Sequence, residues 1–201
     1  MMPSERTGAK GAVVLKVGGS LAQSDAAARL MRGVSTRRPD RLLIVPGGAA
    51  FADAVRKAQA QHGLSEQASH HMALLAMHQY GVLLADLAPG FALAEAPAQF
   101  ETAWRAGLTP IWLPAAMVSA APDVPCSWDV TSDSLAAWVA ARIDATRLVL
   151  VKSCALPARP QDARCLAAAG IVDGGFAAYV ESRRFSWTVV SGTEAALATL
   201  A

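Results

Sequence analysis

The sequence is poor in charged residues and in cysteine, and each shortage excludes a class of protein. Charged side chains make up 17% of the 201 residues, and the formal net charge is only +2. A nucleic-acid-binding protein normally carries a basic patch, so we expect no nucleic-acid partner. The three cysteines, Cys126, Cys154 and Cys165, are odd in number and widely spaced. They fit neither a disulfide framework nor a zinc site, so we expect a reducing compartment and no resident metal.

Long uninterrupted apolar segments are also missing. Lys16 interrupts the first apolar run, so we expect no signal-peptide core there. The longest apolar region, MALLAMHQYGVLLADLA, contains His78, Gln79 and Asp86, which makes it a poor membrane span. We therefore expect a cytoplasmic protein without a membrane partner. Hydrophobic residues make up 53% of the chain, enough for one domain with a sizeable core.

What the sequence does contain is an alternation of strand-like and helix-like segments. The strand-like segments are continuous apolar runs, which is typical of a parallel sheet covered by helices on both faces. We expect strands at residues 12–17, 41–48, 108–114, 146–153 and 186–192, and helices at 24–36 (with Ser24 as N-cap), 49–63, 65–81, 98–107, 131–144, 176–184 and 193–200. Residues 91–97 give only a weak signal, and residues 115–128 and 154–165 are expected to be loops.

Two of the expected strands end in a glycine pair, in LKVGGS and IVPGGA. Ligands of open α/β sheets bind at the carboxyl ends of the strands, and glycines there let the backbone approach a ligand. Consecutive backbone N–H groups followed by a helix form a site for an anion. Gly18, Gly19, Gly47 and Gly48 therefore indicate a site for two phosphate groups. Neither G-x-x-x-x-G-K-[ST] nor G-x-G-x-x-G occurs, so the scheme differs from those two motifs.

Three charged residues lie where they could serve such a site. Lys16 precedes the first glycine pair, and Lys152 ends the strand expected at 146–153. Each ammonium either extends from the core to solvent or offsets charge on a transferring phosphoryl group. Asp133 falls in the first turn of the helix expected at 131–144. It either compensates the helix dipole, holds a lysine ammonium in place, or binds Mg²⁺ through water.

These segments together resemble the amino acid kinase superfamily. The resemblance rests on LKVGGSL, IVPGGAAFADAVR and TSDSLAAW in this order, and it covers nearly the whole chain from residue 12. It implies a three-layer α/β/α sandwich with a mainly parallel central sheet. It also implies a tail at residues 1–11 and one domain at 12–201, with an acceptor lobe at about 12–145 and a reduced nucleotide lobe at about 146–201.

The resemblance implies a role for each matching residue. Lys16 would lie between the γ-phosphate of ATP and the acceptor, Asp133 would orient the catalytic lysines, and Lys152 would be a cation on the nucleotide side. The nucleotide would contact Gly18, Gly19, Ser20 and Ser153, and the acceptor would contact Gly47, Gly48, Ala49, His71 and Asp129.

The resemblance to one subgroup of this superfamily is carried by two segments, SHHMALLAMHQYGVLLADL and SWDVTSDSLAAWVA. They are similar to the kinases that convert (aminomethyl)furanmethyl phosphate to a diphosphate in methanofuran-type cofactor biosynthesis. This resemblance implies ATP and Mg²⁺ and a small phosphate-bearing acceptor. The helix expected at 65–81 is apolar on most of its circumference, which indicates a subunit interface, so we expect a homo-oligomer.

Two departures from the superfamily pattern keep other functions open. The second glycine turn reads Gly-Gly-Ala, and the turn after Lys152 reads Ser153-Cys154-Ala155, where many relatives have an aspartate and a glycine. One alternative is a protein on the same fold that binds a nucleotide or an oxyanion without turnover. The other is a kinase for a different phosphate or carboxylate acceptor.

Overall fold

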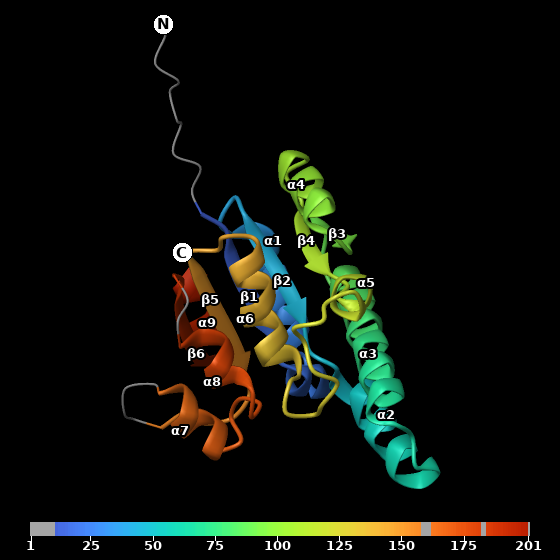
Figure 1. Ribbon diagram of the computed structural model, residues 1–201. Coiled ribbons are helices and arrows are strands. Elements are labelled where there is room, and N and C mark those ends of the chain that lie inside the picture. Colours follow the sequence, from blue (N-terminus) through green and yellow to red (C-terminus); the bar gives the residue numbers. More distant parts are fainter. Residues whose placement is uncertain (1–10, 158–161, 182–183, 201) are drawn as a thin grey trace, which may run out of the picture.

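The structure is a computed structural model that describes residues 11–157, 162–181 and 184–200 (Figure 1). The expected tail at 1–11 lies outside the described residues except for Gly11. Part of the expected loop at 154–165 and the end of the expected helix at 176–184 lie outside them as well.

One parallel sheet forms the centre of the described fold. Its strands are β1 (Val13–Val17), β2 (Leu42–Pro46), β3 (Phe91–Ala94), β4 (Thr109–Trp112), β5 (Arg147–Lys152) and β6 (Ser186–Ser191), in the order β3-β4-β2-β1-β5-β6. Each neighbouring pair runs parallel. β1 and β5 are central because they are buried continuous apolar runs, as a strand covered on both faces requires.

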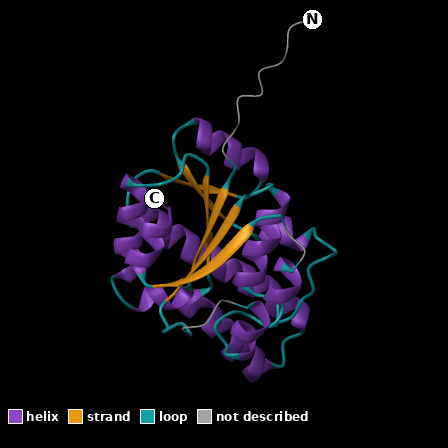
Figure 2. Ribbon diagram, turned by 90° about the vertical axis from the view of Figure 1, so that its left-hand side faces the viewer, coloured by secondary structure: helices purple, strands orange, loops and turns teal. Residues whose placement is uncertain are grey.

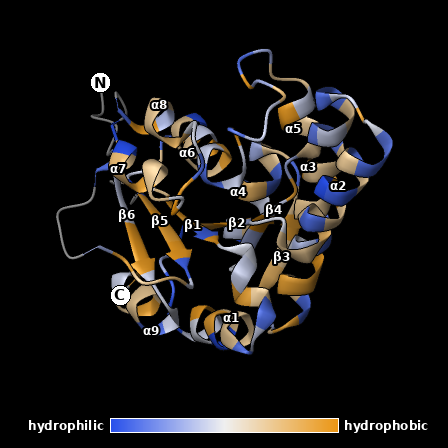
Figure 3. Ribbon diagram, turned by 90° about the horizontal axis from the view of Figure 1, so that it is seen from below, coloured by the Kyte–Doolittle hydropathy of each residue, from blue (hydrophilic) through white to orange (hydrophobic). Residues whose placement is uncertain are grey.

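Helices cover both faces of this sheet (Figure 2). Their bounds are α1 (Ala26–Thr36), α2 (Ala49–His62), α3 (Glu66–Asp86), α4 (Pro97–Arg105), α5 (Ala115–Ser119), α6 (Ser132–Arg142), α7 (Ala163–Ala168), α8 (Phe176–Val180) and α9 (Thr193–Leu200), with a short 3₁₀ helix η1 (Gly19–Gln23) after β1. Figure 3 shows α1 and α9 on one side of the central strands and α6, α7 and α8 on the other. The predicted α/β/α sandwich with a parallel sheet is therefore confirmed.

The core consists of two clusters, one on each face of the sheet. Because side chains alternate along a strand, Val14 of β1 joins the cluster under α6, while Leu15 joins the cluster under α1 and α9. Helix α3 packs along the edge and contributes to both: Met77 belongs to the α6 side and Tyr80 to the α1 side. The α6 face is the one on which Lys16 of β1 and Lys152 of β5 lie.

Several elements differ from the sequence prediction, and tertiary contacts explain the differences. Residues 91–97 contain the edge strand β3, which pairs only with β4 and leaves Leu93 half-exposed. The expected loop at 115–128 begins with α5, whose first N–H group donates to Nε2 of His78 at 2.9 Å. The loop expected at 154–165 includes the start of α7, which Asp162 caps. The first helix begins at Ala26, with Asp25 rather than Ser24 as N-cap.

No helix within the described ranges combines the length and the apolar character that a membrane crossing needs.

Candidate functional site

The two strand-end lysines point to the same face of the sheet. Lys16 lies two residues after Val14 in β1, and Lys152 lies two residues after Leu150 in β5. Val14 and Leu150 both belong to the core cluster on the α6 side of the sheet. β1 and β5 are neighbours in parallel register, with Lys16 opposite Leu150. Since residues two apart share a face, both ammonium groups reach the same space under the start of α6.

Asp133 occupies that space and contacts both lysines. Its Oδ1 lies 2.7 Å from Nζ of Lys16, and its Oδ2 lies 2.7 Å from Nζ of Lys152. Asp133 is 4% exposed and Lys16 is 3% exposed, so this is a buried cluster of one anion and two cations. The structure thereby favours one of the three interpretations of Asp133, the one in which it holds lysine ammonium groups.

Burial and charge act in opposite directions on this cluster. Burial alone would raise the pKa of Asp133, but the ammonium groups of Lys16 and Lys152 outweigh it and hold the pKa below its usual value. Burial, together with the charge of Lys16, lowers the pKa of Lys152 to about 8, although Asp133 opposes this shift. Three charges sum to one net positive charge, which a bound anion would compensate.

Asp173, in the loop between α7 and α8, is a functional candidate that sequence reasoning missed. Its backbone N–H donates to Oδ2 of Asp133 at 3.3 Å. Its carboxylate accepts from the backbone N–H and the hydroxyl of Thr131, at 2.9 and 2.8 Å, and from the backbone N–H of Ser134 at 3.0 Å. The Ser134 hydroxyl donates to it as well. Asp173 therefore caps the start of α6, the helix that carries Asp133.

The two glycine turns pack directly on each other. The N–H of Gly47 donates to the carbonyl of Val17 at 2.9 Å. A Cβ atom on Gly19 would lie 2.5 Å from the backbone nitrogen of Ala49, and one on Gly47 would lie 2.7 Å from the backbone nitrogen of Gly19. Glycine is required at these positions because backbone meets backbone there, whether or not a ligand is bound.

Ala49, the residue after Gly48, has an unusual backbone conformation. Its φ is +47°, in the left-handed region that glycine adopts without steric cost. Glycine is the third residue of this turn in the superfamily pattern, so the departure noted in the sequence falls on a strained position.

Two further contacts connect the first glycine turn to its surroundings. The hydroxyl of Ser153, after β5, donates to the hydroxyl of Ser20 at 2.7 Å, which brings two predicted nucleotide contacts together. The hydroxyl of Tyr80 on α3 lies 3.5 Å from the carbonyl oxygen of Gly18. Burial raises the pKa of Tyr80 to about 12, so this hydroxyl stays protonated at neutral pH.

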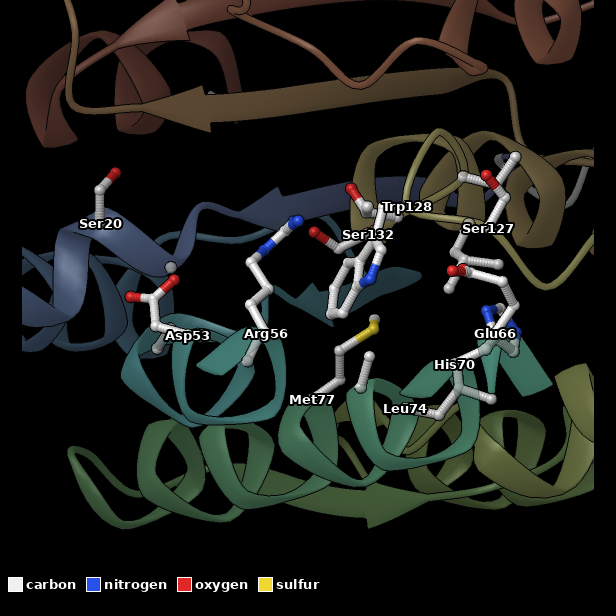
Figure 4. Close-up of a pocket in the computed structure, with 18 of the residues that line it drawn as sticks. Ser20, Asp53, Arg56, Glu66, His70, Leu74, Met77, Ser127, Trp128 and Ser132 are labelled. Carbon is white, nitrogen blue, oxygen red and sulfur yellow. The ribbon is translucent and has the colours of Figure 1, made fainter. Parts of the chain in front are cut away.

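A cavity of about 280 Å³ opens beside the glycine turns, between α2, α3 and the segment before α6 (Figure 4). Predicted site residues on its wall are Gly19, Ser20, Gly48 and Ala49. The wall also contains residues that sequence reasoning did not select: Asp53, Arg56, Glu66, His70, Met77, Trp128 and Leu135. Arg56 stacks on the indole ring of Trp128, with its guanidinium carbon 3.8 Å from the ring centroid.

Three of the predicted acceptor contacts are not part of the cavity wall: Gly47, which packs against Gly19, and two exposed side chains. His71 is exposed, and its Nδ1 lies 3.4 Å from the hydroxyl of Ser119. Asp129 is exposed, and its carbonyl accepts from the N–H of Gly175 at 2.6 Å. Neither is among the residues that line the cavity. On α3 it is His70 that faces the cavity, four residues after Glu66 and therefore on the same side of the helix.

The described residues include no group of three or more His, Cys, Asp or Glu side chains placed to hold a metal ion. Both oxygens of Asp133 are occupied by lysines, so this carboxylate does not fit the role of a direct Mg²⁺ ligand. The donor set at this edge of the sheet is cationic, which suits phosphate oxygens rather than a metal ion.

Solved structures with the same architecture include several kinases and an N-acetylglutamate synthase. The chain is similar to uridylate kinase from Archaeoglobus fulgidus, with a TM-score of 0.70 and 16% identity over 94% of this chain and 95% of that one. UMP kinase from Bacillus anthracis gives a TM-score of 0.64 at 10% identity, over 90% and 87% of the two chains. Aspartate kinase from Synechocystis gives 0.63 at 13% identity, over 89% and 37%.

Sequence comparison identifies one curated relative and one family. The chain is 24% identical over 139 residues to [5-(aminomethyl)furan-3-yl]methyl phosphate kinase from Methanocaldococcus jannaschii. This match covers 68% of the chain and 63% of the relative, slightly less than two thirds of the relative's length. The model of the amino acid kinase family matches residues 11–155, the segment that contains both glycine turns, Lys16, Asp133 and Lys152. The chain therefore belongs to the amino acid kinase family.

Proposed function

We propose that this protein is an ATP-dependent kinase that phosphorylates the phosphate group of a small phosphomonoester. The observation that carries the proposal is the Lys16–Asp133–Lys152 cluster, which lies at the carboxyl ends of two adjacent strands and next to two glycine turns. Phosphoryl transfer depends mainly on positioning and on positive charge near the transferred group. The cluster supplies both.

The chemistry requires no protein base. A phosphomonoester carries a charge of about −1.5 to −2 at neutral pH, so its own oxygen attacks the γ-phosphorus of ATP. A new P–O bond forms, the bond between the γ-phosphorus and the β–γ bridging oxygen breaks, and ADP leaves with that electron pair. Asp133 is a poor base because its pKa is lowered and both oxygens contact ammonium groups. Its role is to hold Lys16 and Lys152.

The two substrates would meet at this cluster, each at one of the two glycine turns. ATP, which arrives with its Mg²⁺, would place its phosphates near Gly18, Gly19, Ser20 and Ser153. The acceptor phosphate would lie at Gly47 and Gly48, where the 14-residue helix α2 begins and its first N–H groups favour an anion.

For the acceptor we propose [5-(aminomethyl)furan-3-yl]methyl phosphate, the compound named for the Methanocaldococcus jannaschii relative. Its product would be a diphosphate in methanofuran-type cofactor biosynthesis. The cavity of about 280 Å³ lies at the small end of the usual range for ligand sites, which favours a small acceptor over a nucleotide.

The test measures ADP release from ATP·Mg²⁺ with a panel of this furan phosphate, UMP and isopentenyl phosphate, and identifies the product by mass. We expect turnover of the furan phosphate, with kcat/KM at least about tenfold above the other two. A higher kcat/KM for UMP or for isopentenyl phosphate would show that the proposed acceptor is wrong, while the proposed kinase activity would stand.

A nucleotide-binding protein without turnover is the second candidate. The turn Ser153-Cys154-Ala155 after Lys152 favours it, because it lacks the aspartate and the glycine of the superfamily pattern. ATP binding by calorimetry without ADP release on any acceptor would support this candidate and contradict the kinase.

A further inference from the structure

We infer that Glu66 binds a cationic group of the acceptor, at the end of the cavity opposite to the glycine turns. The inference rests on the proposed kinase function and adds the residue that selects the acceptor. It assigns the substrate class as phosphomonoesters that carry a protonated amine on the far side of a small apolar body.

Helices α2 and α3 set the two ends of the cavity. Helix α2 starts at the second glycine turn with Ala49, and near its other end Gln59 donates through Nε2 to Oε1 of Glu66 at 2.8 Å. Ten residues of helix separate Ala49 from Gln59, which corresponds to about 15 Å of rise. Figure 4 shows Ser20 at one end of the cavity and Glu66 with His70 at the other.

The Glu66 carboxylate is exposed to solvent at this end of the cavity and has no cationic partner among the described residues. The neutral amide of Gln59 is its hydrogen-bond partner. His70 lines the same end of the cavity. Burial and the neighbouring His71 lower the pKa of His70, so it adds no positive charge at neutral pH.

The middle of the cavity is largely apolar, although Arg56 lies there with its guanidinium carbon 3.8 Å from the centroid of the Trp128 ring. The indole N–H of Trp128 donates to Oε1 of Gln59 at 2.6 Å, so one amide fixes both the Trp128 ring and the Glu66 carboxylate. Leu74, Met77, Val130 and Leu135 complete the apolar wall. A flat ring fits this section, because aromatic and apolar side chains bury it without needing polar partners.

The cavity thus presents three chemical regions in sequence. Glycine turns and a helix start suit a phosphate, the apolar middle suits a small ring, and the Glu66 carboxylate suits an ammonium group. A first-turn glutamate also stabilises a helix through the dipole. Glu194 also lies in the first turn of its helix, α9, is exposed like Glu66 and lies outside the cavity, so it provides a control for that effect.

The experiment compares two acceptors in the wild type, Glu66→Gln and Glu194→Gln. The acceptors are [5-(aminomethyl)furan-3-yl]methyl phosphate and (5-methylfuran-3-yl)methyl phosphate, which lacks the amine. Glu66→Gln keeps the oxygen that accepts from Gln59 and removes the charge. It is expected to lower kcat/KM for the amine by about 10- to 100-fold, mainly through KM. It should leave the amine-free acceptor within about twofold, and Glu194→Gln should keep the wild-type ratio.

Glu66→Gln with the wild-type preference for the amine would overturn the inference and leave the kinase intact. Absence of turnover of both furans by the wild type would instead refute the proposed function. In that case, calorimetry with each acceptor in the absence of ATP, on the wild type and on Glu66→Gln, tests the role of Glu66 independently of turnover. Tighter binding of the amine by the wild type, lost in Glu66→Gln, supports the inference, and equal or absent binding of the two acceptors overturns it.

Discussion

Asp173 donates its backbone N–H to Oδ2 of Asp133 at 3.3 Å, across 40 residues of sequence. The same residue caps helix α6 with its carboxylate. The loop between α7 and α8 therefore fixes the position of the anion that contacts both lysines. We propose that Asp173 is a positioning residue, which acts through Asp133 on the Lys16–Asp133–Lys152 cluster.

Asp173→Asn tests this role. An amide keeps the size of the side chain but cannot accept at both oxygens, so the start of α6 loses part of its cap. We expect a loss of about 1–3 kcal/mol in the free energy of unfolding, measured in urea. We also expect a fall in kcat with KM for ATP nearly unchanged. Asp162→Ala removes the oxygen that accepts from the N–H of Cys165, and with it the cap of α7, and serves as the control, because α7 carries none of the three charged residues. Equal kcat in the two variants would contradict a positioning role for Asp173.

The lowered pKa of Lys152 predicts a pH dependence of activity. In the free enzyme this lysine loses its proton near pH 8, and the neutral amine no longer offsets phosphate charge. We expect kcat/KM to fall above pH 8, approaching tenfold per pH unit. Lys152→Arg keeps the charge beyond pH 12, so any activity it retains should show no such decline between pH 8 and 10. A wild-type profile that is flat over this range would count against Lys152 as a required cation.

The same pKa predicts how stability changes with pH. Lys152 titrates near 8 in the folded protein but at 10.5 in the unfolded chain. Between these values the unfolded state binds more protons, so the free energy of unfolding rises with pH. Relative to Lys152→Met, the wild type should gain stability from pH 8 to pH 10, measured by urea unfolding at each pH. If the wild type instead loses stability relative to Lys152→Met between pH 8 and pH 10, the pKa of Lys152 is not lowered on folding.

Ala49 provides a prediction about backbone strain. With φ at +47°, Ala49→Gly should relieve steric strain and stabilise the protein by up to about 1 kcal/mol. Ala54 is an exposed position in the middle of the same helix. Ala54→Gly should destabilise the protein by about 0.8–1 kcal/mol, because glycine is a poor helix former. Thermal unfolding shows whether each of the two variants is more or less stable than the wild type. A destabilised Ala49→Gly protein would contradict the proposed steric strain at Ala49.

Much of the fold could be predicted from the sequence because β1, β2 and β5 are continuous apolar runs that only a doubly covered sheet accommodates. The meeting of Lys16 and Lys152 also followed from their positions at the ends of such strands. Asp173 could not be found in this way, since its partners Thr131 and Ser134 are about 40 residues away and no local pattern marks them.

The helical period could have improved the prediction on α3. Residues 66, 70, 74 and 77 line the cavity, and they recur at the spacing of one helix face. His71 lies about 100° around the helix from His70, which explains why it contacts Ser119 outside the cavity.

The expected homo-oligomer stays a prediction. Met72, Leu75, Val82 and Leu83 of α3 are exposed apolar side chains, together with Leu93 of β3. Light scattering of the purified protein would test whether they form a subunit interface.

The proposed kinase depends above all on Lys16, which would supply positive charge at the transferred phosphoryl group. The most direct measurement is kcat for ADP release by Lys16→Met, with the exposed residue Lys57 changed to Met as control. We predict a loss of about 10³-fold or more for Lys16→Met, a folded variant by circular dichroism, and kcat near that of the wild type for Lys57→Met. Near-normal kcat in a folded Lys16→Met protein would contradict the account.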